Sequence, residues 1–252
     1  MTADPALDEE FARWRNAGQE PRFWLRDDDA GEPGPALDRL IALCEKFEVP
    51  LLLAVVPERA GPALGERLRD VRLVRPCVHG IAHRDNAREG ERKIELGGRM
   101  ATADILDGLR ASREKLEGLF GARLSGILVP PWNRIAPDIA ARAHECGFTA
   151  LSTWSWEPRG TLLPEINTHV DLMDWTTRQG RPPEWIRGEL LRRLSQARAR
   201  GGAPIGILSH HLDHDDRAWR TLEGLLRHLT VERGFAFHHA DDLAAGMQPR
   251  PQ

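Results

Sequence analysis

Phe23-Trp24-Leu25-Arg26-Asp27-Asp28-Asp29-Ala30-Gly31 joins a short apolar run to three adjacent carboxylates. The apolar run 23–25 predicts a buried strand, which places the carboxylates at its C-terminal end, where α/β sheets and barrels carry their chemistry. Three adjacent carboxylates repel one another unless a cation lies among them, and a divalent metal would supply that cation. An acidic turn is the simpler interpretation, since Asp and Gly are common turn residues.

The composition is that of an ordinary globular protein. The 252 residues are 41% hydrophobic and 29% charged, with a formal net charge of -3. No linker divides the chain, so we expect a single domain over residues 1–252. The charge gives no reason to expect a nucleic-acid partner. No signal peptide or membrane span is apparent, so we expect a cytoplasmic protein without a membrane partner. The oligomeric state stays open.

The three cysteines, Cys44, Cys77 and Cys146, are widely spaced and odd in number. This pattern favours reduced thiols in the core over a disulfide framework. Cys77 lies two residues before His79, but we interpret it as a core thiol, because burial is the common fate of a cysteine in a strand.

Strands and helices alternate along the chain after an amphipathic N-terminal segment. Apolar runs predict strands at 23–25, 51–56, 71–78, 127–129, 148–152, 166–170, 205–208 and 235–237. Periodicity predicts helices at 37–47, 63–69, 103–120, 137–146, 183–200 and 218–229, with Thr102 as an N-cap and Gly121 and Gly147 at helix ends. Seven or eight strands alternating with helices favour an irregular (β/α) barrel, with an open doubly wound sheet as the alternative.

Residues of the kinds that form catalytic and binding sites follow five of the predicted strands, and a barrel would bring them all to one face. They are Asp27 to Asp29, His79 and His83, Pro131 and Trp132, Asp171 and Asp174, and His210 and His211. This coincidence, more than any single motif, favours a functional site over scattered surface residues.

His79 and His83 are four residues apart, so one helical turn would direct both imidazoles at a common point. Zinc binds histidine nitrogen and aspartate oxygen, and two histidines with one carboxylate leave positions open for water and substrate. Cobalt, nickel or iron would suit the same ligands. The alternative, in which His79 caps a strand and His83 lies on the surface, loses weight because a carboxylate cluster follows a neighbouring strand.

The pair His210 and His211 follows the buried strand at 205–208. A histidine in that position suits a general acid or base, because imidazole titrates near neutral pH. Either residue of the pair could face the site. Catalytic imidazoles need an orienting group, and one of Asp171 and Asp174 could supply it.

Eight tryptophans are present, and most tryptophans pack in a core or at a barrel rim. Trp132 and Trp175 are the two that we expect to contact a sugar or an acyl group. Both belong to the segments that follow predicted strands. A small-molecule or glycan substrate is therefore the expected partner.

In order and chemistry these motifs resemble the polysaccharide deacetylase family with the NodB homology domain, carbohydrate esterase family 4. Its Thr-Phe-Asp-Asp-Gly and His-Ser/Thr-x-x-His motifs are similar to Arg26-Asp27-Asp28-Asp29-Ala30 and His79-Gly80-Ile81-Ala82-His83. Its Arg-x-Pro-Tyr/Trp, Asp-x-x-Asp-Trp and Leu-x-His motifs are similar to Val129-Pro130-Pro131-Trp132, Asp171 to Trp175 and Leu208-Ser209-His210.

The resemblance covers about residues 22–240 and implies a metal-dependent deacetylase with a (β/α) barrel. Asp29, His79 and His83 would hold a divalent metal, most simply zinc, and Asp28 would be the catalytic base. The remaining predicted site residues are the catalytic Asp174, His210 and Trp132, and the substrate-binding Pro131, Trp132 and Trp175.

Three positions depart from the family's motifs. Val129 stands in place of the arginine that positions the catalytic base, and Arg26 or Arg134 could reach the same place. Ala30 replaces a glycine and Asp27 replaces an aromatic residue. These departures bear on the usual N-acetylglucosamine substrate more than on the metal.

Two other functions remain as alternatives. A hydrolase with the same barrel could act on a non-sugar C–N bond, such as a cyclic imide or ureide, and the missing arginine motif favours it. A binding protein could keep the metal for structure, or recognise a glycan without cleaving it. We expect catalysis, because a base, an acid and metal ligands are all represented.

Overall fold

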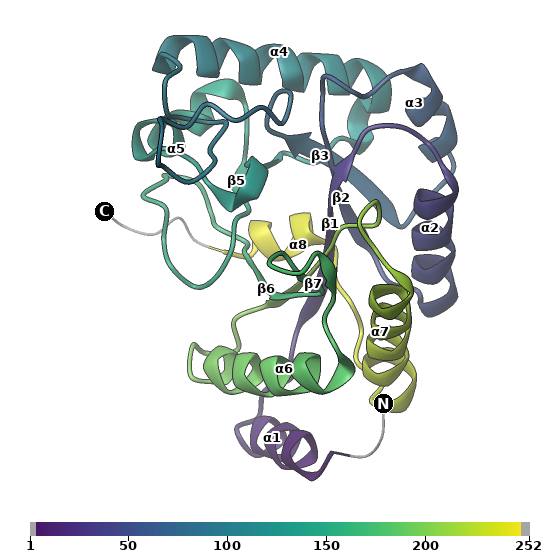
Figure 1. The fold of residues 1–252 in the computed structure, drawn as a ribbon. Helices are drawn as coiled ribbons and strands as arrows, with labels where there is room; N and C mark the ends of the chain where they lie inside the picture. Colours follow the sequence, from purple (N-terminus) through teal and green to yellow (C-terminus); the bar gives the residue numbers. More distant parts are fainter. Residues whose placement is uncertain (1–3, 248–252) are drawn as a thin grey trace.

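Seven parallel strands form a curled sheet in the computed structural model, which describes residues 4–247 (Figure 1). Their order is β5-β4-β3-β2-β1-β9-β6. The strands are β1 (Phe23–Ala30), β2 (Leu51–Val55), β3 (Val74–His79), β4 (Ile127–Val129), β5 (Ala150–Leu151), β6 (Thr168–Asp171) and β9 (Ile205–Ser209). Isolated bridges of Leu151 to Glu165 and of Trp154 to Thr168 connect the two ends of the sheet. The prediction of an irregular (β/α) barrel with seven or eight strands is confirmed.

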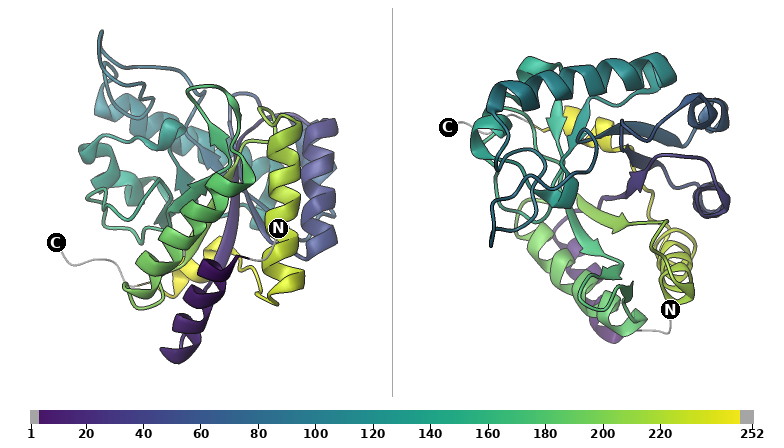
Figure 2. Two further views of the ribbon diagram at one scale, coloured as in Figure 1. Left: turned by 60° about the horizontal axis from the view of Figure 1, so that its bottom comes forward. Right: turned by 45° about the horizontal axis from the view of Figure 1, so that its top comes forward.

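Helices surround the curled sheet on its outer side (Figure 2). They are α2 (Pro35–Phe47), α3 (Pro62–Leu68), α4 (Thr102–Phe120), α5 (Pro137–Arg142), α6 (Pro183–Arg198) and α7 (Asp216–Arg227), with α1 (Pro5–Asn16) against α6. Short elements complete the fold: α8 (Ala240–Ala245), the hairpin β7 (Met173–Asp174) and β8 (Gln179–Gly180), the 3₁₀ turns Gly121–Arg123, Pro131–Asn133 and Ala143–Cys146, and a π turn at His228–Glu232.

Side chains alternate between two apolar layers along each strand, as the period of two in a strand requires. On β1, Phe23 and Leu25 join the layer between sheet and helices, whereas Trp24 joins a second cluster inside the barrel. Helix α8 contributes Leu243 to that inner cluster and closes the end of the barrel where the strands begin. The apolar plug leaves the opposite end, where the strands finish, for polar side chains.

The first strand is longer than its apolar run predicted. It continues to Ala30, so the three aspartates belong to the strand itself and do not follow it. Residues up to Asp27 pair with both β2 and β9, and the register then shifts before Ala30 pairs with Val55. Asp29 lies in this irregular segment with a φ of 74°, which turns its side chain away from the strict alternation of the strand.

The prediction that His79 and His83 share a helical turn is wrong. His79 is the last residue of β3, and His83 lies in the loop that follows. Gly80 and His83 have φ values of 62° and 58°, and this left-handed backbone cannot continue a right-handed helix. The loop, not a helix, brings the second imidazole back toward the first.

Two smaller predictions are also wrong. Residues 235–237 form no strand; Phe237 makes one bridge to Phe23, and Phe235 is held by ring contacts with Phe11 and Phe23. Their apolar character reflects burial without strand pairing. Thr102 does not cap α4, because the helix begins at Thr102 itself and the side chain donates a hydrogen bond to Asp138.

The three cysteines are buried and free, as predicted for core thiols. Burial raises the pKa of Cys77, so its thiol stays protonated. Within residues 4–247, none of the helices has both the length and the apolar composition that crossing a membrane requires.

Gly206 on β9 gives a test of the inner layer. A Cβ atom added there would lie 2.6 Å from Cε2 of the buried Trp24, which cannot move away. Gly206→Val should therefore lower the free energy of unfolding by about 1–3 kcal/mol, the common cost of overpacking. Urea unfolding followed by circular dichroism measures this loss.

The matched control is Gly224→Ala in α7, where an added Cβ meets nothing within 4 Å. Alanine favours helix over glycine, so this variant should unfold at the same or a higher urea concentration than the wild type. Equal midpoints for Gly206→Val and the wild type would contradict the packing described here.

Candidate functional site

Asp29, His79 and His83 converge at the end of the barrel where the strands finish. Nε2 of each histidine lies 3.0 Å from Oδ1 of Asp29, and one possible ligand atom from each residue lies within 4.8 Å of the others. Two imidazole nitrogens and one carboxylate oxygen are a donor set that zinc accepts with positions left for water and substrate. The three residues predicted as metal ligands thus lie together.

The imidazole of His79 is oriented by the backbone of Val129. Nδ1 of His79 lies 2.9 Å from the Val129 carbonyl oxygen and donates to it, because a carbonyl can only accept. This hydrogen bond fixes the tautomer and leaves the lone pair of Nε2 free for a cation. Val129 stands where the related motif has an arginine, and its carbonyl oxygen orients His79.

Glu95 shapes the loop between the two histidines, and the sequence analysis missed it. The buried carboxylate accepts three backbone N–H groups, from Ile81 at 2.9 Å, Ala82 at 2.8 Å and Arg84 at 2.9 Å. These bonds hold the left-handed turn that carries His83. The available signal was a single acid between apolar neighbours in Ile94-Glu95-Leu96, which is too short a pattern to identify a partner.

Electrostatics at this cluster favour the ionised carboxylate. Burial alone would raise the pKa of Asp29, but hydrogen bonds from His79 and His83 outweigh it, and the pKa is held far below its usual range. Burial likewise would lower the pKa of His79, and its hydrogen bond to Asp29 raises it instead.

Arg26 and Asp28 form a buried ion pair, and Asp28 is the neighbour in sequence of Asp29. Nε of Arg26 lies 2.8 Å from Oδ1 of Asp28, and Nη2 lies 2.9 Å from Oδ2. The guanidinium also donates to Oδ1 of Asn133 at 2.6 Å. Arg134, the other candidate for the missing arginine, donates to the Lys93 carbonyl instead. Of the two candidate arginines, Arg26 is therefore the one that contacts Asp28.

The structure separates the two neighbouring histidines. His210 lines the same cavity as Asp28, with Nε2 3.9 Å from Oδ2 of that residue. His211 hydrogen-bonds through Nδ1 to the buried Asp27, which also accepts the Ser209 hydroxyl at 2.6 Å. Of the pair, His210 is the one that faces the candidate catalytic base.

Asp171 takes the place that was predicted for Asp174. Asp171 lines the cavity, accepts the indole N–H of Trp175 at 2.8 Å, and its burial raises its pKa despite the nearby His210. Asp174 does not line the cavity; its Oδ2 lies 3.7 Å from Arg181. The last strand residue of β6 reaches the site, whereas Asp174 lies on the β7–β8 hairpin beyond it.

A cavity of about 700 Å³ joins these groups. Seven predicted residues line it: Asp28, Asp29, His79, His83, Trp132, Trp175 and His210. Trp154, which was assigned to packing, lines it too, while Pro131 is buried behind the wall. The backbone of Trp132 is left-handed, with a φ of 54°, and its N–H has no partner among residues 4–247. It is therefore free to donate to an oxyanion.

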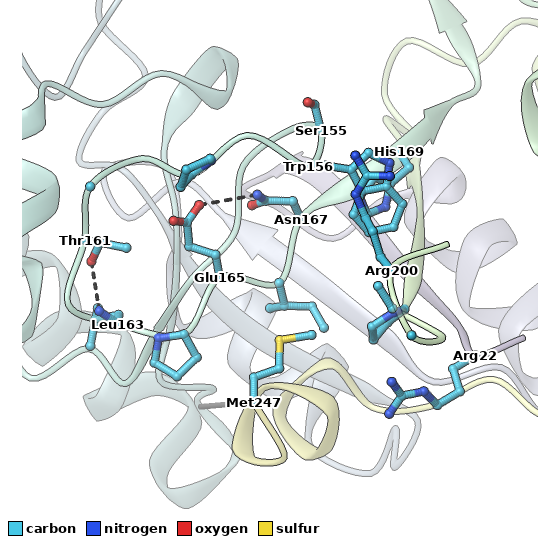
Figure 3. Close-up of a pocket in the computed structure, with 17 residues that line it drawn as sticks. Arg22, Ser155, Trp156, Thr161, Leu163, Glu165, Asn167, His169, Arg200 and Met247 are labelled. Carbon is cyan, nitrogen blue, oxygen red and sulfur yellow. Dashed lines mark hydrogen bonds between the residues drawn. The ribbon is translucent and has the colours of Figure 1, made fainter. Parts of the chain in front are cut away.

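Figure 3 shows a second cavity, of about 840 Å³, that contains none of the predicted site residues. Its wall includes Trp156, whose ring stacks on His169 at 3.6 Å. Nδ1 of His169 accepts the Gly206 N–H, and burial lowers the pKa of this imidazole well below its ordinary value. With no carboxylate and imidazole cluster of the metal-binding kind, this cavity is the weaker candidate for catalysis.

Solved structures with the same arrangement of strands and helices are deacetylases and their relatives. The Bc1960 peptidoglycan N-acetylglucosamine deacetylase matches with a TM-score of 0.61 and 16% identity, over 91% of this chain and 90% of that chain. A family 4 carbohydrate esterase from Streptomyces lividans matches with a TM-score of 0.56 and 16% identity, over 86% of this chain and 92% of that chain. This chain has the NodB-like fold.

Another protein with this NodB-like fold is BA3943 of Bacillus anthracis, a CE4 family pseudoenzyme. It matches with a TM-score of 0.61 and 13% identity, over 89% of this chain and 66% of that chain. No protein-family model matches the sequence, and no curated protein matches it either. At these identities the likeness is one of fold, and the function is argued from the site itself.

Removal of a histidine tests the metal centre. His79→Ala should lower the affinity for zinc by more than about 100-fold, beyond the loss that an outer hydrogen-bond partner commonly causes. Equilibrium dialysis against buffered zinc, with the metal measured by atomic absorption, gives the affinity. His144→Ala changes an exposed histidine on the outer helical layer and should bind zinc as the wild type does. Equal affinities for all three proteins would exclude the proposed ligands.

Removal of Arg26 tests the buried ion pair. Arg26→Met should lower the free energy of unfolding by about 3–5 kcal/mol, because it leaves Asp28 as an uncompensated buried charge. The double variant Arg26→Met, Asp28→Asn should recover much of that loss. Arg142→Met, which breaks an exposed ion pair with Glu145, should change stability little. If Arg26→Met is no less stable than Arg142→Met, Asp28 does not depend on this arginine.

Proposed function

We propose that this chain is a metal-dependent hydrolase that removes an N- or O-acyl group from a sugar-containing substrate. One observation carries the proposal. The buried carboxylate of Asp28, which pairs with Arg26, lies next to the three-residue candidate metal-binding cluster, in a cavity that His210 also lines. A base, an acid and a metal site within one cavity are the parts that acyl hydrolysis needs. The NodB-like fold supports the same reading.

The residues fit a divalent metal. Asp29, His79 and His83 would hold it, and zinc suits two nitrogens and one oxygen best, with cobalt, nickel or iron as alternatives. When bound, the ion would polarise the acyl carbonyl and lower the pKa of a water molecule from about 15.7 toward 7. The hydrogen bond from His79 to Val129 supports this role, because it directs Nε2 at the ion.

Different side chains of the protein would carry out the two proton transfers. Asp28 accepts a proton from the attacking water, and Arg26 keeps the carboxylate oriented. His210 donates a proton to the leaving amine or alcohol. The free N–H of Trp132 donates to the oxyanion that forms at the carbonyl carbon, a type of contact worth about 10²–10³ in rate. Asp171 would act on His210 through charge.

Two alternatives have some support. One of the proteins with this fold is a pseudoenzyme, which favours the alternative that this chain binds a ligand without turning it over. The departures at Val129 and Asp27 favour a hydrolase of a non-sugar C–N bond, such as a cyclic imide or ureide. Arg26 weakens this second argument, since it restores the partner of Asp28 that the motif lacks.

The proposal is tested with zinc-loaded protein and a panel of N-acetyl and O-acetyl sugars, with cyclic imides and ureides as a second set. Asp28→Asn should lower kcat/KM for the best acylated sugar by about 10²–10⁴, the usual contribution of a general base, while the zinc content stays unchanged. Asp104→Asn, on the exposed side of α4, is the control and should match the wild type.

Each alternative has a distinct result. Turnover of imides or ureides without turnover of acylated sugars would replace the substrate class. Saturable binding of a glycan with no turnover by the zinc-loaded wild type, and equal binding by Asp28→Asn, would replace catalysis with recognition.

A further inference from the structure

Five basic side chains line the cavity outside the metal-binding cluster. We call Arg92, Lys93, Arg134, Arg159 and Arg178 the cationic rim. Arg92 and Lys93 come from the long segment between β3 and α4, Arg134 follows the turn of Trp132, and the other two come from the loops after β5 and β7. Loops that are distant in sequence thus bring like charges to one opening.

None of the cationic rim forms an ion pair with a carboxylate of residues 4–247. Arg134 donates to the Lys93 carbonyl, and Arg159 donates to the Thr153 hydroxyl and the Trp154 carbonyl, all of them neutral oxygens. The Lys93 ammonium lies 5.7 Å from the centroid of the Trp132 ring. The side chains of Arg92 and Arg178 have no partner in this part of the chain.

Several other exposed arginines of this protein form ion pairs with acids close to them in the sequence, as Arg110 does with Asp107 and Arg142 with Glu145. In the rim, partial burial and then repulsion from Arg92 lower the pKa of Arg134. Asp85 acts on Arg134 and Lys93 only at a distance, because its Oδ1 accepts the backbone N–H groups of Ala87 and Ile94.

The acids on the cavity floor do not cancel the rim, because two of them have cations of their own. Asp28 pairs with Arg26, which lies behind the wall, and Asp29 belongs to the metal-binding cluster. The other two acids that line the cavity, Asp171 and Asp213, are half-buried and form no ion pair with the cationic rim. A concave opening with five cations and few free acids carries a positive potential that attracts anions.

We propose that the substrate is an acylated molecule that also carries an anionic group, a carboxylate or a phosphate, and that the cationic rim binds this group. The inference rests on the proposed hydrolase function and specifies its substrate class. Arginine matches the planar and tetrahedral oxygen groups of both anions through paired hydrogen bonds. Trp132, Trp154 and Trp175 line the same cavity and offer flat ring faces to the body of the substrate. The cavity volume, about 700 Å³, accommodates a small ligand of this kind.

Matched substrates test the inference. The zinc-loaded protein is given N-acetylglucosamine, its 6-phosphate and N-acetylmuramic acid, which share the acyl group and differ in charge. We expect kcat/KM to be at least about tenfold higher for one of the two anionic sugars, the factor that a hydrogen bond to a charged group commonly contributes. The preference should shrink as the salt concentration rises. The phosphate and carboxylate arms distinguish the two anions.

The double variant Arg92→Gln, Arg178→Gln should remove most of the preference by raising KM for the anionic sugar, with kcat nearly unchanged. The kcat/KM for the neutral sugar should fall by a smaller factor, so the ratio of kcat/KM between the anionic and the neutral sugar should approach one. Arg220→Gln, an exposed arginine of α7 that lines no described cavity, is the control and should keep the preference. Equal kcat/KM for neutral and anionic sugars, or an equal loss for both in the double variant, would overturn the inference.

Binding separates a failure of this inference from a failure of the proposed function. Titration calorimetry with zinc-loaded Asp28→Asn measures the affinity for each sugar without turnover. An anionic sugar should bind more tightly than the neutral sugar and lose this advantage when Arg92→Gln and Arg178→Gln are added. That result would support anion binding by the cationic rim even if the wild type cleaved no acyl group. Indistinguishable binding of neutral and anionic sugars would refute the rim even in an active enzyme.

Discussion

Arg26 and Asp28 meet inside the barrel because alternate residues of a strand point to the same face. A buried carboxylate is stable only when its charge is matched, and both of its oxygens lie within 2.9 Å of the guanidinium. The remaining N–H groups of Arg26 reach oxygens of Asn133, Ser152 and Thr153, which lie on the segments after β4 and β5. This one ion pair therefore joins the strand of the candidate base to the walls of the cavity.

The three consecutive aspartates are compatible with folding because each carboxylate has a different hydrogen-bonding or ion-pair partner. Asp27 points toward the outer layer and pairs with His211, Asp28 points inward to Arg26, and Asp29 turns with its positive φ toward His79 and His83. The expectation of one cation among the acids was too simple. The strand's alternation and its irregular end distribute the three charges over three sites, and only the last of them is suited to a metal.

Strands and loops have different parts in this site. The candidate base, one candidate metal-ligating aspartate and one candidate metal-ligating histidine are on β1 and β3, where neighbouring strands fix the backbone. His83 is on a loop, yet three hydrogen bonds to the buried Glu95 hold its turn. The cationic rim is on the loops that surround the cavity. Such a division lets the chemistry stay in place while the loops determine which molecule enters.

The sequence by itself determined the barrel, the helical layer and the clustering of acids and histidines at one end, because alternation of apolar runs with amphipathic segments has few compact solutions. Only the tertiary structure decided that Arg26 partners Asp28, that His210 and not His211 faces the cavity, and that Asp171 replaces Asp174 there. Each of these depends on the direction in which a side chain points from a strand or from the residues that directly follow it. Spacing along the chain does not encode that direction, since it arises from contacts between segments more than a hundred residues apart.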